Sequence, residues 1–184
     1  MDIFTQGLET ERMYLVPLEE KYAEDYFREL NAEITKYMTP SPAKDISETK
    51  ARMQGTIQKM QRKEKIALVY INKTTSEFIG GLNISGLGNP TLKVGLWTKK
   101  SVHGQGFGRE GMLALIERVQ KNLDFEYILY PADKDNRPSR KIAELAGGIL
   151  EVDKKGEEIV IREATADPEK FLNAVEYKIY KRNA

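Results

Sequence analysis

The sequence contains no cysteine and a single histidine, His103. Without cysteine the chain has no disulfide, no thiolate nucleophile and no cysteine-ligated zinc. One imidazole excludes every site that needs two, including the zinc site of His-Glu-x-x-His hydrolases. We therefore expect no metal site, and a chemistry that uses backbone groups, hydroxyls, carboxylates or a bound cofactor.

An excess of charge and a long apolar run are also missing. The 29 Lys and Arg residues against 28 Asp and Glu leave a net charge of +1, so the broad basic field that nucleic-acid or anionic-membrane binding usually needs is absent. No apolar run approaches the roughly 20 residues that span a bilayer. The first residues also lack the basic and apolar regions of a signal peptide. We expect a cytoplasmic protein without nucleic-acid or membrane partners.

The residues that are present predict one α+β domain. Hydrophobic residues make up 40% and charged residues 31% of 184 residues, which are globular proportions, and there is no repeat or linker. We expect a single domain over residues 1–184. Periodicity predicts strands at 11–18, 66–71, 77–84, 92–98, 127–130, 149–152, 158–162 and 175–180, and helices at 21–31, 47–61, about 108–123 and 139–146.

The connections between these elements restrict the topology. Short links make the strands between residues 66 and 98 an antiparallel meander, because a parallel crossover needs a longer connection. Only the passage from Leu92 to Tyr130 is long enough for a parallel or splayed crossover. Ser47 is the expected N-cap of the second helix.

Three glycines at alternate positions stand between a predicted strand and the long helix. Gly104, Gly106 and Gly108 allow positive φ angles and let backbone N–H groups approach a ligand closely. A helix N-terminus adds its dipole, and this combination favours an anion, most often phosphate. We expect an anion-binding loop here rather than a turn that merely joins two elements.

The same loop matches the dinucleotide fingerprint G-x-G-x-x-G from Gly106 to Gly111. In a Rossmann unit the first glycine follows its strand almost at once, whereas residues 99–105 intervene here. A Walker loop is absent, since no Gly-Lys-Ser/Thr occurs. A nucleotide-dependent oxidoreductase is kept as a minor alternative.

A different family accounts for more of the chain. The stretch 103–108 (HGQGFG) resembles the acetyl-CoA loop of the GNAT N-acetyltransferases, with His103 in the position that usually holds Gln or Arg. Five further segments resemble ribosomal-protein N-terminal acetyltransferases in the family's order. They are 8–18 (LETERMYLVPL), 39–42 (TPSP), 78–81 (FIGG), 94–97 (VGLW) and 136–148 (NRPSRKIAELAGG).

This resemblance implies a fold and a donor. The GNAT fold has a mixed central sheet of about seven strands, helices on both faces and a splayed strand pair, here 94–98 and 127–130, that holds the cofactor. The implied cosubstrate is acetyl-CoA. The implied cofactor-binding residues are Trp97, Thr98, His103, Gln105, Gly106, Phe107, Gly108, Arg109, Asn136 and Ser139.

The positions at which the family usually has its acid and its base hold other residues in this sequence. Ala143 stands where some relatives have a tyrosine, so Ser139 is the hydroxyl that we expect to protonate the thiolate; its alternative is the N-cap of a helix. Lys93 replaces the usual Glu and is protonated at neutral pH, so it is not expected to be the base. The carboxylates of Glu48, Glu77 and Asp133 are weaker candidates.

Several interpretations of single residues stay open. His103 either directs an N–H group at phosphate, lies on the loop surface or acts as a base. Trp97 and Tyr130 belong either to the sheet core or to the acceptor site.

The predicted function is the transfer of an acetyl group from acetyl-CoA to a primary amine, with a protein N-terminus as one acceptor. A small-molecule acceptor and a non-catalytic acyl-CoA sensor are the alternatives. The acceptor-side segments, residues 37–61 and 164–175, contain no decisive motif. We expect a monomer or a homodimer.

Overall fold

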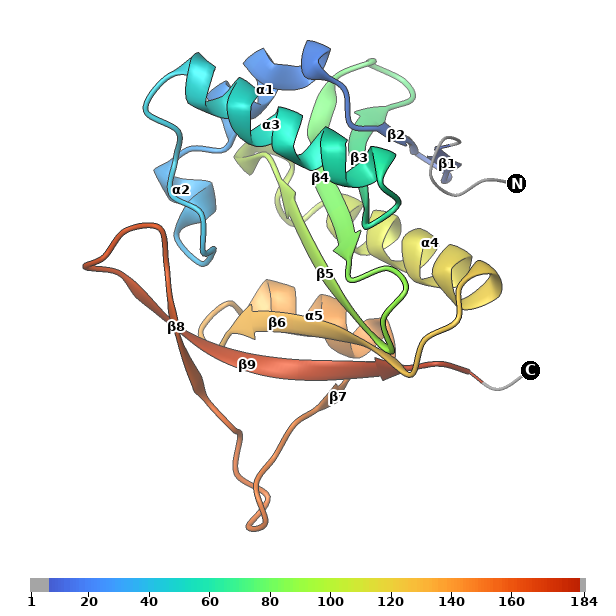
Figure 1. Ribbon diagram of the computed structural model, residues 1–184, viewed down its shortest axis with the longest axis vertical. Helices are drawn as coiled ribbons and strands as arrows, with labels where there is room; N and C mark the ends of the chain where they lie inside the picture. The colour runs from blue at the N-terminus through green and yellow to red at the C-terminus, as the bar shows by residue number, and fades with distance from the viewer. Residues whose placement is uncertain (1–6, 183–184) are drawn as a thin grey trace.

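A nine-stranded sheet organises residues 7–182, the part of the chain that the computed structural model describes (Figure 1). The strand order is β1-β2-β3-β4-β5-β6-β9-β7, and β8 also pairs with β9. The strands are β1 (Leu8–Glu9), β2 (Met13–Pro17), β3 (Lys65–Asn72), β4 (Phe78–Ser85), β5 (Thr91–Thr98), β6 (Tyr127–Asp133), β7 (Ile149–Leu150), β8 (Ile161–Ala164) and β9 (Phe171–Tyr180).

The strand count corrects the expectation of about seven. Leu8–Glu9 pairs with β2 as a strand of its own, because the chain reverses between them with Thr10 N–H donating to Met13 O. Both β7 and β8 pair with one edge of β9, at different points along its length. A long last strand therefore accommodates two short partners.

The expected parallel crossover is confirmed. All pairs of neighbouring strands are antiparallel except β5 and β6, which α4 (Phe107–Asn122) connects. The parallel register runs from Thr91–Tyr127 to Lys93–Leu129 and ends there. Beyond Lys93 the two strands separate, and this leaves an edge of β5 facing open space.

Helices cover both faces of the sheet, as expected (Figure 1). One face carries α1 (Ala23–Glu29) and α3 (Ile46–Gln61), and the other carries α4 and α5 (Arg137–Leu145). No helix within residues 7–182 is long and apolar enough to cross a membrane.

The first helical region differs from its prediction over 21–31. It divides into a 3-10 turn, η1 (Glu20–Tyr22), then α1 and then α2 (Ala32–Thr35). The division comes from Asn31, whose side-chain oxygen accepts from Glu33 N and Ile34 N and so begins a new helix. The N-cap of α3 is Asp45 rather than Ser47, because the Asp45 carboxylate accepts from Glu48 N.

Alternation along the strands divides the core into two layers. Ile66, Leu68 and Tyr70 of β3 face α4, whereas Ala67 and Val69 face α1 and α3. The layer beneath α4 is the larger and continues to α5 and β9. The layer beneath α1 and α3 is smaller, and two cavities lie beside it.

Candidate active site

The glycine loop ends at the N-terminus of α4. Gly106 is the N-cap and has φ +84°, a left-handed conformation that favours glycine. It has no side chain to cap the helix, so the N–H groups of Phe107, Gly108 and Arg109 have no intrahelical acceptor. These N–H groups and the helix dipole form a site for an anion.

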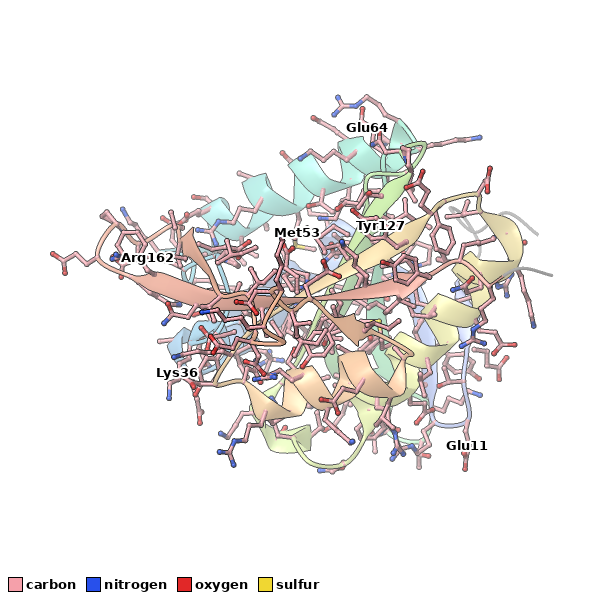
Figure 2. The ribbon with its side chains drawn as sticks, turned by 90° about the horizontal axis from the view of Figure 1, so that it is seen from below. Glu11, Lys36, Met53, Glu64, Tyr127 and Arg162 are labelled. Atoms are coloured by element: carbon pink, nitrogen blue, oxygen red, sulfur yellow. The ribbon has the colours of Figure 1, made fainter. Side chains whose placement is uncertain are left out.

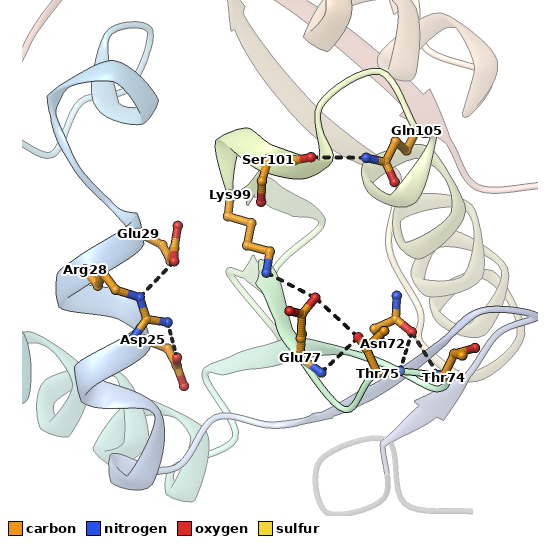
Figure 3. A network of polar contacts seen from close by, with 10 residues as sticks. All are labelled: Asp25, Arg28, Glu29, Asn72, Thr74, Thr75, Glu77, Lys99, Ser101 and Gln105. Carbon is orange, nitrogen blue, oxygen red and sulfur yellow. Dashed lines mark hydrogen bonds and ion pairs between the residues drawn. The ribbon is translucent and has the colours of Figure 1, made fainter.

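Gln105 and His103 shape this loop. Gln105 N–H donates to Val102 O at 3.3 Å, and its side-chain amide donates to Ser101 O at 3.1 Å (Figure 3). The His103 ring lies with Nε2 3.0 Å from Thr98 O, and because a carbonyl only accepts, Nε2 carries the proton. The imidazole therefore makes its hydrogen bond to the end of β5.

Arg12, for which the sequence analysis predicted no role, immediately precedes β2 and contacts the loop. Its Nη1 donates to Gln105 O at 3.0 Å, its Nε to Glu110 Oε2 at 2.7 Å, and its guanidinium lies 4.3 Å from the Phe107 ring centroid. Partial burial acts to raise the pKa of Glu110, but hydrogen bonds from Thr10 and Arg12 hold that pKa below its ordinary value. Arg12 thus lies beside the anion site, where Glu110 fixes its orientation and offsets part of its positive charge.

Arg109 adds a second cation at the same place. A β-carbon on Gly106 would lie 3.5 Å from Arg12 Nη2 and 3.9 Å from Arg109 Nη2. Two guanidinium groups therefore flank the glycine whose backbone begins α4. This arrangement suits a ligand with more than one negative charge, such as a diphosphate.

A cleft of about 410 Å³ opens where β5 and β6 separate. It brings together three of the predicted site residues, Trp97, Asn136 and Ser139, with Tyr130 from β6. A second cavity of about 200 Å³ lies beneath α1 and α3 and shares Trp97 with the cleft. Trp97 therefore belongs both to the core layer under α1 and to the walls of the two cavities.

The two predicted polar residues of α5 have different roles in the helix. The cap of α5 is Asn136, whose Oδ1 accepts from Ser139 N at 3.2 Å, and this corrects the alternative that made Ser139 the cap. The Ser139 hydroxyl instead lies 3.0 Å from Tyr130 Oη. Burial raises the pKa of Tyr130 to about 12, so both hydroxyls stay protonated at neutral pH.

The candidate carboxylates are dispersed. Glu77 lies 3.6 Å from Lys99 near the glycine loop (Figure 3), and Glu48 pairs with Arg52 on α3; neither lines the cleft. Asp133 does line the cleft, but its oxygens accept from Asp135 N and Asn173 N.

Glu163 of β8 is a further carboxylate of the cleft, which the sequence analysis missed. It lies 3.7 Å from Lys93, which it partly neutralises. Within residues 7–182 no group of three or more acidic or histidine side chains is arranged to hold a metal ion.

The two acceptor-side segments meet above the cleft. Lys170, in the connection between β8 and β9, donates from Nζ to Thr35 O at 2.7 Å and to Met38 O at 3.2 Å. Ala166 N–H donates to Thr39 O at 2.9 Å. These bonds join the β8–β9 connection to the segment before α3, two segments that are distant in sequence and lie side by side (Figure 1).

The comparisons with known proteins agree with this geometry. Residues 12–149 match the family model described as an acetyltransferase (GNAT) domain. None of the curated proteins compared with the sequence matches it.

Solved structures share the fold at low identity. A RimL ribosomal L7/L12 alpha-N-protein acetyltransferase in complex with coenzyme A has a TM-score of 0.80 at 17% identity, covering 95% of this chain and 98% of its own. The ribosomal-protein-S5-alanine acetyltransferase from Vibrio fischeri gives 0.79 at 14%, covering 95% and 96%. The microcin C7 self-immunity acetyltransferase MccE, in complex with acetyl-CoA and AMP, gives 0.77 at 19%, covering 92% and 93%.

Proposed function

The chain belongs to the GNAT acetyltransferase family, and we propose that it transfers the acetyl group of acetyl-CoA to a primary amine, with the α-amine of a protein N-terminus among the acceptors. The observation that carries this proposal is the uncapped N-terminus of α4, flanked by Arg12 and Arg109, next to the separated edge of β5. The first feature suits the pyrophosphate of coenzyme A, and the second suits its pantetheine arm.

The separated strands account for how the thioester is activated. Where β5 no longer pairs with β6, its N–H and C=O groups on that edge are available to the arm and to the thioester oxygen. A backbone N–H directed at this oxygen stabilises the negative charge that develops as the amine attacks. Asn136, at the start of α5, contributes an amide N–H₂ group to the same cleft.

Ser139 is the proposed proton donor to the departing thiolate. Its hydroxyl lines the cleft, and the contact with Tyr130 Oη fixes its position and supplies a neighbouring O–H. A hydroxyl donates at any working pH, whereas Lys93 is paired with Glu163 at 3.7 Å. The proposed base is one of the two carboxylates of the cleft, Glu163 or Asp133, which would accept the proton of the amine through a water molecule.

Two variants, compared by how much acetyl-CoA stabilises them against unfolding, test the donor assignment. Gly106→Val places a β-branched side chain at a left-handed position and between the two guanidinium groups, so we expect acetyl-CoA binding to be lost. Gly156→Val is the control, since Gly156 also has positive φ but lies in the distant 153–158 turn. At a concentration 100 times Kd, acetyl-CoA is expected to stabilise the control by about 2.7 kcal/mol. Equal stabilisation of Gly106→Val would contradict the site.

A thiol-release assay, which detects free coenzyme A, separates an enzyme from a sensor. Release of free coenzyme A that depends on both acetyl-CoA and an amine supports the transferase. Binding of acetyl-CoA without release over a broad amine panel indicates the acyl-CoA sensor instead. A single domain over residues 1–184, a cytoplasmic location and a monomeric or homodimeric state stay predictions.

A further inference from the structure

Three neighbouring strands beneath α1 and α3 form a floor between the two cavities. Their register places side chains of the same face in rows that cross β3, β4 and β5. The first row is Lys65, Ser85 and Lys93, the second is Ala67, Asn83 and Gly95, and the third is Val69, Gly81 and Trp97. Successive rows are about 7 Å apart, because residues two apart along a strand share a face.

The third row is the apolar end of this floor. Trp97 packs edge-on against Tyr26 at 5.1 Å, and Phe78 completes the aromatic group at 5.6 Å from Trp97. Met53 extends from α3 (Figure 2), and it lines the same cavity of about 200 Å³. This end of the floor suits a large apolar group of a ligand.

The first row is the cationic end, and its two lysines differ. Lys93 has a partner, the Glu163 carboxylate. Lys65 lines both cavities and is half-buried, and among the described residues its ammonium group has no hydrogen bond or ion pair. Burial lowers the pKa of the Lys65 ammonium, with a smaller contribution from Lys59.

The other charged side chains that line the cavities have partners: Asp133 accepts from Asp135 N and Asn173 N, and Glu163 pairs with Lys93. Arg52 pairs with Glu48 at 2.5 Å, and it also donates to Ser41 O. The smaller cavity has no acidic residue in its lining. Lys65 is therefore the charge of this floor that a ligand has to neutralise, since a partly buried cation without a partner is unfavourable.

The second row lies between these two ends and beside the separated edge of β5. Asn83 Nδ2 donates to Gly95 O at 3.3 Å, which directs the other end of the carboxamide, an acceptor, into the cavities. Gly95 has no side chain, and a β-carbon there would meet only Asn83 Nδ2, at 3.5 Å. The row thus provides open space and an acceptor for an amine next to the thioester.

We propose that the acceptor of this enzyme is a primary amine that also carries a large apolar side chain and a carboxylate, the carboxylate within about 7 Å of the amine. Lys65 binds the carboxylate, Asn83 accepts a hydrogen bond from the amine, and the pocket around Trp97 receives the side chain. An apolar α-amino acid has this chemistry, and so does a peptide that begins with an apolar residue followed by an acidic one. The proposal rests on the proposed function, which places the amine next to the thioester of acetyl-CoA. The binding site that it describes is testable without turnover.

The single tryptophan of the chain makes binding measurable directly. Trp97 is that tryptophan and lines both cavities, so its fluorescence reports a ligand on this floor. We titrate the protein, saturated with coenzyme A, with phenylalanine, phenylalaninamide and aspartate. We expect phenylalanine to bind about ten- to a hundredfold more tightly than the amide, because the amide lacks the charged partner of Lys65. Aspartate, with no apolar side chain, is expected to bind weakly.

Lys65→Met tests the assigned residue. It keeps the length and apolar stem of the side chain and removes the charge, so we expect the affinities for phenylalanine and its amide to become equal. Lys59→Met is the matched control, because Lys59 is exposed on α3 and lines neither cavity; it should retain the preference. Equal affinities in the wild-type protein, or a preference that survives in Lys65→Met, would overturn the proposal.

Turnover then identifies the source of the acceptor and separates the two hypotheses. Acetylation of phenylalanine above the blocked dipeptide phenylalanyl-aspartyl-amide identifies a free amino acid, and the reverse order identifies a peptide N-terminus. Turnover of amines without any preference for the carboxylate would remove this inference and leave the transferase intact. Carboxylate-dependent quenching of Trp97 with no turnover would keep the binding site and remove the transferase.

Discussion

At the scale of single residues, the cleft contains two hydroxyl groups in contact, those of Ser139 and Tyr130. Ser139 is free of the capping role because Asn136 takes it, and its hydroxyl contacts Tyr130. Ala143 stands at the position where the sequence resemblance implies a tyrosine in some relatives, and it is fully buried in the core. Ser139 and Tyr130 therefore place two hydroxyl groups side by side in the cleft.

Ser139→Ala is expected to lower kcat by about ten- to a hundredfold, since positioned acids contribute roughly 10²–10⁴. The melting temperature should change little, because Asn136 continues to cap the helix. Tyr130→Phe keeps the serine and removes its partner, so its loss of kcat should be smaller. Steady-state kinetics with saturating acetyl-CoA measures both. An unchanged kcat in Ser139→Ala beside an inactive Glu163→Gln would assign the chemistry to the carboxylate instead.

Asn136 combines a structural and a binding role, and two variants separate them. Asn136→Ala removes the cap and should cost about 1 kcal/mol of stability. Asn136→Asp keeps an oxygen for Ser139 N but removes the amide N–H₂, so stability should persist. The KM for acetyl-CoA should nonetheless rise about two- to tenfold, the effect of one hydrogen bond. A normal KM in Asn136→Asp would restrict this residue to capping.

At the scale of elements, β3 and α4 are joined by an unusually close contact. A β-carbon on Gly111 would lie 2.5 Å from Tyr70 Cζ, so only glycine lets the first turns of α4 lie on this ring. Tyr70 is completely buried, and among the described residues its Oη is the buried side-chain polar atom without a hydrogen-bond partner. The close approach that positions α4 for anion binding therefore encloses an unpaired hydroxyl.

Tyr70→Phe is expected to raise the free energy of unfolding, because an unpaired buried hydroxyl costs about 1–3 kcal/mol. Tyr177→Phe is the matched control. Tyr177 is equally buried, but its Oη accepts from Arg140 Nε at 2.9 Å, so the control should lose stability. Urea unfolding of the two variants measures the difference. Equal destabilisation would mean that the Tyr70 hydroxyl has a partner in solution.

At the scale of the whole molecule, three tyrosines connect stability to alkaline pH: Tyr70 and Tyr130 are buried, and Tyr26 is half-buried. Burial raises the pKa of Tyr26, Tyr70 and Tyr130, the last to about 12, whereas in the unfolded chain each titrates near 10. Below pH 10 both states keep these protons and the pKa difference has no effect. Above pH 10 the unfolded chain releases protons that the folded chain retains, so the stability falls.

We expect the free energy of unfolding to decrease as pH rises from about 10 to about 12, by about 1.4 kcal/mol per pH unit for each such tyrosine. Tyr130→Phe removes one of the three and should reduce this slope. Tyr14→Phe serves as the control, because Tyr14 is 46% exposed. Chemical unfolding at pH 9, 10.5 and 11.5 measures the slopes. Identical slopes in all three proteins would contradict the assignment to buried tyrosines.

The sequence by itself determined the glycine loop before α4, the α+β class and the parallel crossover. These are local properties: glycine spacing, hydrophobic period and connection length act within a few residues of each other. It also supplied Trp97, Asn136 and Ser139 as residues of one site, through their resemblance to a family's motifs.

Only the tertiary structure decided what faces these residues. Arg12 reaches the loop from the turn before β2, 93 residues before the bonded Gln105 carbonyl, and Glu163 reaches the cleft from β8. Lys65 lies in one row with Lys93 because β3, β4 and β5 pair in a particular register. A register slip of one residue would turn every one of these side chains to the other face. Register and long-range pairing are set by the packing of the whole core, and no local pattern encodes them.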